Sequence, residues 1–213
     1  MTKNLINDKY SRNNNKLRTK GDILILCCGN TEKIYFELFK EKYKNYLKKV
    51  KIKIVSHKKS QPLEVVNEAI KQKIKDPNVE VWAVFDYDNE SCFDMAIEEA
   101  IKNDIYLAFS NICFEYWFFL HFKNNKKSMT SKMLITELEN KYNITYDKKP
   151  EAINTIFKKI INNITVAEER ALNFYETYQT GPQEKISKWC SCTSVFKLTK
   201  KLREWRLANR GYD

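Results

Sequence analysis

Residues 79–88, VEVWAVFDYD, constrain the fold more than any other stretch of the chain. From Val81 to Phe85 every residue is apolar, which is typical of a strand that is buried on both faces of a parallel sheet. The run stops at two aspartates separated by one tyrosine. We therefore expect a central strand that ends in a pair of acidic residues, Asp86 and Asp88.

Strand patterns and helix patterns alternate between residues 22 and 124. Further strands are expected at 22–29, 50–57 and 105–111, and helices at 31–49, 62–76, 93–104 and 114–122. This alternation predicts an α/β fold with a central, mostly parallel four-stranded sheet flanked by helices. The apolar strands at 22–29 and 79–88 are expected at its centre, whereas Lys51 and Lys53 mark strand 50–57 as an edge.

After residue 124 only helical patterns remain, at 131–142, 150–163, 165–179 and 193–207. They predict a C-terminal helical subdomain packed on the sheet. We thus divide the chain into a basic flexible arm at 1–21, an α/β domain at 22–124 and a helical region at 125–213. Within the last helix pattern, residues 196–206 are basic and aromatic, so this part either follows a nucleic-acid backbone or has a core face and a solvated basic face.

The charge of the chain is concentrated near its start. The net charge is +11, and residues 1–60 hold 16 Lys and Arg against 5 Asp and Glu. Such a region suits a polyanion such as RNA or DNA, although lysine-rich solvated surfaces are also common. No apolar run reaches the roughly 18 residues of a membrane span, so we expect a cytoplasmic protein that contacts no membrane. The six cysteines lack zinc-site spacing.

Polar residues cluster where the expected strands end, and ligands of open parallel sheets bind at these carboxyl ends. The residues concerned are Gly29, Asn30, Thr31 and Glu32 after the first strand, Asp86 and Asp88 after the third, and Ser110 and Asn111 after the fourth. Strand alternation places Asp86 and Asp88 on one side, where Mg²⁺ or Mn²⁺ would relieve the repulsion of two carboxylates. The alternative is a helix cap or a solvated turn.

Other polar residues have two interpretations each. Glu115 is either a second carboxylate for metal or a favourable charge at a helix N-terminus. His121 is either a proton donor to a phosphate or a core residue. Ser110 and Asn111 either contact phosphate or cap the following helix. The turn at Gly29 and Thr31 offers backbone N–H groups to an anion.

The segments VWAVFDYDNESCFDMAIEEA and SNICFEYWFFLHF closely resemble the RloB-like proteins, which are found near bacterial restriction and phage-defence loci. ILILCCGNTEKIYF and CTSVFKLTKKL fit the same family, so the resemblance runs from about residue 22 to 202. It implies a Toprim-like fold, a Rossmann-like domain that handles phosphodiester bonds with one or two Mg²⁺ ions.

The resemblance also assigns residues. Asp86 and Asp88 match the acidic pair of Toprim domains, and Glu32 matches the second glutamate of the family's E-G-x-T-E turn. Cys28 stands at the place of the first glutamate. A thiol is a poor general acid or base there and a soft ligand for the hard ion Mg²⁺. Either Glu32 therefore joins Asp86 and Asp88 as a metal ligand without a second glutamate, or the protein has lost catalysis and keeps only binding, or the residue is an introduced change.

Three functions remain open at this point. The first is an Mg²⁺- or Mn²⁺-dependent Toprim-type nuclease in anti-phage defence that cleaves RNA, including tRNA, or DNA. The second is a catalytically silent Toprim domain that binds nucleic acid or a partner protein of a defence system, as Cys28 suggests. The third is a phosphate-ligand domain without nucleic acid. A homo-oligomer is compatible with each of them.

Overall fold

The computed structural model describes residues 22–47, 50–56, 61–88, 90–125, 127–180, 184–189 and 191–208, and the predicted arm at 1–21 lies outside these ranges. The first part alternates as predicted. Its elements are β1(Ile23–Cys27), α2(Asn30–Lys42), β2(Ile52–Ser56), α3(Pro62–Lys75), β3(Glu80–Asp86), α4(Phe93–Lys102), β4(Tyr106–Asn111) and α5(Glu115–Leu120). Helix α2 ends earlier than predicted, because residues 43–47 form turns with hydrogen bonds such as Tyr46 N to Tyr43 O at 2.9 Å.

The sheet has the strand order β2-β1-β3-β4-β5. Strands β1 to β4 are parallel, which confirms the predicted α/β class, and β1 and β3 lie inside the sheet while β2 forms an edge. A fifth strand, β5(Cys192–Thr193), pairs antiparallel with β4. The prediction of four strands was therefore one strand short, because a two-residue strand has too few residues to show a period of two.

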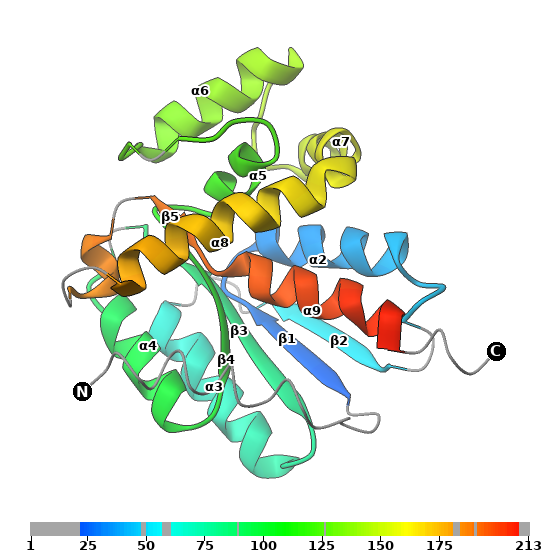
Figure 1. The fold of residues 1–213 in the computed structure, drawn as a ribbon. Coiled ribbons are helices and arrows are strands. Elements are labelled where there is room, and N and C mark those ends of the chain that lie inside the picture. Colours follow the sequence, from blue (N-terminus) through cyan, green and yellow to red (C-terminus); the bar gives the residue numbers. More distant parts are fainter. Residues whose placement is uncertain are drawn as a thin grey trace.

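Helices cover both faces of the sheet. In Figure 1, α2 and α9(Val195–Ala208) lie on one face, and α3 and α4 lie on the other. The chain runs from β1 to the edge strand β2 and then crosses behind β1 to reach β3. The strand order thus reverses between β1 and β3. This reversal is the topological switch point, where ligands of doubly wound sheets bind.

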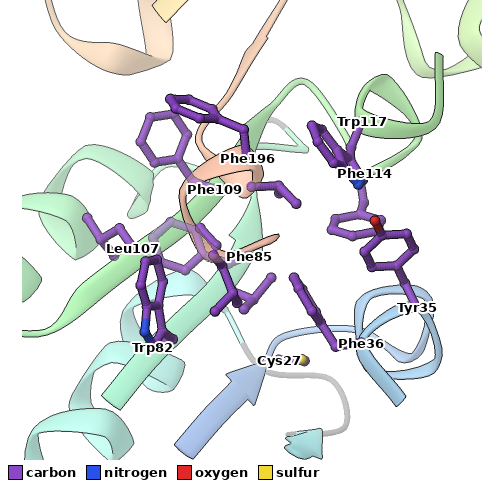
Figure 2. Packing of buried hydrophobic residues seen from close by; sticks show 14 of the residues in the cluster. Cys27, Tyr35, Phe36, Trp82, Phe85, Leu107, Phe109, Phe114, Trp117 and Phe196 are labelled. Carbon is purple, nitrogen blue, oxygen red and sulfur yellow. The ribbon is translucent and has the colours of Figure 1, made fainter. Parts of the chain in front are cut away.

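Aromatic side chains fill the space between the sheet, α2 and α5. Figure 2 shows Tyr35 and Phe36 of α2 near Phe114 and Trp117 at α5, and the rings of Tyr35 and Phe114 are 5.5 Å apart. All six residues of α5 are buried. Because this short helix is enclosed by core packing, the polar residue at its start is held at a fixed place beyond the sheet.

Beyond α5, the residues that the structure describes are mostly helical, as predicted. They form α6(Ser131–Tyr142), α7(Pro150–Ile160), α8(Ile164–Thr180) and α9, with short 3₁₀ segments at Ile161–Asn163 and Ile186–Lys188. Helix α7 packs against α2, α6 against α5, and α8 against α9. Lys201 of α9 also donates to Glu80 at the start of β3, at 3.0 Å. The helical region therefore contacts the start of β3 through α9, and it adds β5 to the sheet at the end of β4.

Candidate functional site

Three carboxylates lie at the carboxyl ends of the parallel strands, and each comes from a different element. Glu32 is in the first turn of α2, directly after β1. Asp86 is the last residue of β3, the neighbouring strand across the switch point. Glu115 is the first residue of α5, which follows β4. We call these three residues the acidic cluster.

Gly29 makes room for the carboxylate of Glu32. Glu32 is buried, and its side chain folds back towards the turn that precedes α2. A Cβ atom on Gly29 would collide with Oε2 of Glu32 and would lie 3.1 Å from its Cδ. The glycine at this position is therefore explained by the close approach of the Glu32 carboxylate, in addition to any role of its backbone.

Asp86 and Asp88 are placed differently from each other. Strand β3 ends at Asp86, and Asp88 is exposed in a turn with a φ of 34°. The Asp88 backbone N–H donates to the carbonyl of Ile112 at 3.0 Å. Strand alternation stops at Asp86, so it no longer decides which way Asp88 points. The two carboxyls still interact, since the charge of Asp88 raises the pKa of Asp86.

Glu115 is the most enclosed member of the acidic cluster. Only 1% of its surface is exposed. Its Oε1 accepts a hydrogen bond from the Tyr146 hydroxyl at 3.0 Å and lies 3.2 Å from Nζ of Lys148. The thiol of Cys113, a weak donor, also interacts with this carboxyl group. Oε2 is buried and has no hydrogen-bond partner in the described part of the chain.

The acidic cluster is electrostatically crowded. The pKa of Glu32 is raised by burial first and then by the charges of Asp86 and Glu115. The pKa of Asp86 is raised by burial first and then by Glu115 and Asp88. Lys148 lowers both values, and it is too weak to cancel the other effects. Carboxyls that are buried together in this way favour protons or cations as partners.

The donor atoms of the acidic cluster suit a hard divalent cation, because carboxylate oxygens are the preferred ligands of Mg²⁺ and Mn²⁺. The buried Oε2 of Glu115 supplies one unused lone-pair site. In this conformation, however, no three His, Cys, Asp or Glu side chains of the described residues are arranged to hold one ion together. The residue types fit a metal, and the side chains would have to move to bind it.

Two residues of this site were missed by the sequence analysis. Tyr146 and Lys148 belong to the loop 143–149 between α6 and α7, more than 30 positions after Glu115. Lysines and tyrosines are frequent in this chain, so neither residue carries a local signal. They belong to the site only because the packing of α6 and α7 places their loop beside Glu115.

The predicted phosphate contacts at the end of β4 are committed to other partners. Ser110 is fully buried, and its Oγ is 2.9 Å from the Thr193 hydroxyl of β5. Asn111 donates through Nδ2 to the carbonyls of Ile186 and Trp189, each at 2.9 Å. Neither side chain caps α5, whose N-cap residue is Phe114. Both join β4 to the chain before α9.

His121 lies in the core. It is 2% exposed, its Nδ1 is 2.9 Å from the Trp117 carbonyl, and its ring packs against the Trp117 ring at 4.9 Å. Burial lowers its pKa to about 4, so the ring is neutral at pH 7. These contacts favour the structural interpretation of His121 over that of a proton donor.

The turn after β1 contains the remaining predicted residues. Cys28 is partly buried, and its N–H donates to the Val84 carbonyl at 2.8 Å, which continues the pairing of β1 with β3. Thr31 is buried and interacts with the Tyr146 hydroxyl. Asn30 is exposed and accepts a long hydrogen bond from Ser56 at 3.4 Å. Cys28 and Thr31 thus lie on the same turn as Glu32, next to the acidic cluster.

The fold and the site define a class: a doubly wound, Rossmann-like α/β protein with buried carboxylates at the switch point of its sheet. The model of the RloB-like protein family matches residues 23–202, which is most of the chain, and the chain therefore belongs to this family. No curated protein and no solved structure showed significant similarity. Among the helices that the structure describes, none is both long enough and apolar enough to cross a membrane.

Proposed function

We propose that this protein is a divalent-metal-dependent nuclease of the Toprim type, which hydrolyses phosphodiester bonds of RNA, including tRNA, or of DNA in bacterial anti-phage defence. One observation carries the proposal: Glu32, Asp86 and Glu115 come from three elements at the carboxyl ends of the parallel strands and interact electrostatically, with more carboxylate than counter-charge. Membership of the RloB-like family supports the setting, because the resemblance implies a Toprim domain in phage defence.

In this proposal the protein's own residues have separate roles. Glu32, Asp86 and Glu115 hold Mg²⁺ or Mn²⁺, and Asp88 adds negative charge at the exposed side. When bound, the ion would supply an activated water and would neutralise charge on the phosphate. Tyr146 positions Glu115 through its hydrogen bond. The sheet and α5 exclude water from the inner side of the acidic cluster, which strengthens each of these electrostatic interactions.

Nuclease activity is tested by incubating the purified protein with labelled tRNA and with plasmid DNA in Mg²⁺ or Mn²⁺. We expect cleavage that disappears on addition of EDTA and in Asp86→Asn. The matched control is Asp94→Asn, because Asp94 bonds to Ser187, outside the acidic cluster. Cleavage that persists in Asp86→Asn would mean that the acidic cluster does not carry the reaction.

A second candidate function rests on Cys28. A thiol beside the acidic cluster replaces the carboxylate that active Toprim domains have at this place, so the domain would bind nucleic acid or a partner protein without cleaving it. In that case the wild-type protein binds tRNA or plasmid in a salt-dependent manner, and cleavage appears only in Cys28→Glu. Equal cleavage by the wild-type protein and Cys28→Ala would exclude the silent form.

A further inference from the structure

We propose that Lys148 is an internal counter-cation of the acidic cluster, which a divalent metal ion must displace. The inference rests on the metal site of the proposed function and deepens it, because it names a residue that regulates access to the same site. It is carried by the ion pair between Lys148 Nζ and Glu115 Oε1, at 3.2 Å.

The ion pair is unequal in its exposure. The Glu115 side chain is 1% exposed, whereas that of Lys148 is 50% exposed. Lys148 therefore reaches into the acidic cluster from the solvent side, while Glu115 is held inside by α5. Withdrawal of Lys148 would cost its ammonium little, because water would solvate it. It would leave the Glu115 carboxylate buried without a counter-charge, which is costly unless another cation takes the place of Lys148.

Other contacts hold the loop and leave the Lys148 side chain half exposed. The Tyr146 hydroxyl donates to Glu115, and the Tyr146 backbone N–H donates to Glu139 at 2.9 Å. Asn143 ends α6 in the left-handed conformation, and Lys148 has a φ of 59°. The loop is thus fixed at Tyr146 on one side of Lys148. The ammonium can leave Glu115 through rotation of its long side chain, without moving the loop.

One ammonium is a poor match for the acidic cluster. Lys148 contributes a single positive charge, while Glu32, Asp86 and Glu115 contribute up to three negative charges. Its Nζ binds one oxygen of Glu115, and the other oxygen of that carboxylate is buried without a hydrogen-bond partner in the described ranges. A divalent ion offers twice the charge and several coordination positions to the same oxygens. The two cations therefore compete for Glu115.

With Lys148 in place, Glu115 is oriented by an ammonium and a hydroxyl, and Glu32 folds back over Gly29. Metal binding exchanges the ammonium for the ion and reorients the carboxylates.

The exchange is tested by calorimetric titration of the full-length protein with Mn²⁺, without nucleic acid. We expect Lys148→Met to bind Mn²⁺ at least about tenfold more tightly than the wild type, because a competing charge a few ångströms away is removed. Lys148→Arg keeps the charge and should stay close to the wild type. Lys149→Met is the matched control, since Lys149 is exposed and pairs with Asp147 at 2.6 Å.

Each outcome separates the two proposals. Unchanged or weaker Mn²⁺ binding in Lys148→Met overturns the competition and leaves the metal site standing. Failure of the wild type and of all three variants to bind Mn²⁺ overturns the proposed function together with the inference. Binding that appears only in Lys148→Met supports the competition in its strongest form.

A second measurement covers the case in which Lys148→Met does not fold. The acetylation rates of Lys148 and Lys149 in the wild-type protein are followed by mass spectrometry with and without Mn²⁺. Displacement predicts faster acetylation of Lys148 in Mn²⁺ and an unchanged rate at Lys149. An unchanged or slower rate at Lys148 contradicts the exchange.

Discussion

Two polar groups of residues lie at the carboxyl ends of the same parallel strands, and they differ in how their polar atoms are paired. At the end of β4, Ser110 and Asn111 bond to Thr193 and to backbone carbonyls of the segment before β5. In the acidic cluster, the charges of neighbouring carboxylates raise the pKa of Asp86, and Glu115 keeps a buried oxygen without a partner in the described part. Paired polar groups of this kind stabilise a fold, whereas crowded carboxylates mark a place for a ligand.

The largest expected difference between the two groups is in activity. Asp86→Asn should lower metal-dependent cleavage by about a thousandfold, because a metal ion contributes several kcal/mol to the transition state. Ser110→Ala should retain cleavage within a few fold. Rates are measured with tRNA or plasmid in Mn²⁺. Equal losses in both variants would remove the distinction between the two groups.

For stability we expect the larger effect from the residues at the end of β4. Asn111→Ala leaves the buried carbonyls of Ile186 and Trp189 without their donor, so the free energy of unfolding should fall by about 2–3 kcal/mol. Asn103→Ala is the control, since its amide bonds to Glu99 at an exposed helix end and should change stability by less than about 0.5 kcal/mol. Urea unfolding checks both values. A loss of Mn²⁺ binding in Asn111→Ala, with the fold retained, would contradict the structural role.

The acidic cluster should also make stability depend on pH. The pKa is raised to about 8 for Glu32 and to about 7 for Asp86. A carboxyl with a higher pKa in the folded state binds more protons when folded. Its contribution is therefore full below about pH 4, its ordinary unfolded value, and is lost as the pH rises towards 8.

Comparison of the wild type with a variant that lacks both carboxyls measures the contribution of Glu32 and Asp86 to stability. Between pH 5 and pH 8 in EDTA, we expect the wild type to lose roughly 6 kcal/mol relative to a Glu32→Gln/Asp86→Asn double variant, because each unit of pKa difference corresponds to about 1.4 kcal/mol. Urea unfolding at four pH values gives the difference. Parallel stability curves for the two proteins would show that the carboxyls are not perturbed.

The smallest expected effect concerns the turn before α2. Gly29→Ala places a Cβ atom against the Glu32 carboxylate and should displace it, at a cost of about 1 kcal/mol or less in stability. Because metal binding is proposed to move Glu32 out of this position, we expect the affinity for Mn²⁺ to change by less than about threefold. Calorimetry measures the affinity. A tenfold or larger loss of affinity would show that the folded-back position of Glu32 is the one that binds metal.

The sequence was sufficient for the elements whose signal is local. The apolar run before Asp86 and the alternation of strands and helices predicted the parallel sheet, because burial on both faces dictates residue type at each position. Asp86 and Glu32 were found because strand ends of a parallel sheet share one edge. Strand β5 was missed, since two residues carry no period.

Long-range contacts account for the other differences. Lys148 and Tyr146 reach Glu115 only through the packing of α6 and α7, which no pattern of spacing records. Asparagine at a strand end is typical of a ligand-binding or capping residue. The hydrogen-bond partners of Asn111 instead lie 75 and 78 positions further along the chain. The sequence therefore predicts where a polar residue at a strand end lies in the fold, whereas its role depends on partners that are distant in the sequence.

Strand β5 also bears on the order in which the protein folds. Its hydroxyl partner on β4 is 83 residues earlier in the chain, so the outer side of β4 acquires its neighbour only through a contact of very high sequence separation. Until then, the backbone groups along β4 are open to strands of other molecules. Variants that weaken β5 are thus expected to raise self-association during refolding before they affect anything at the acidic cluster.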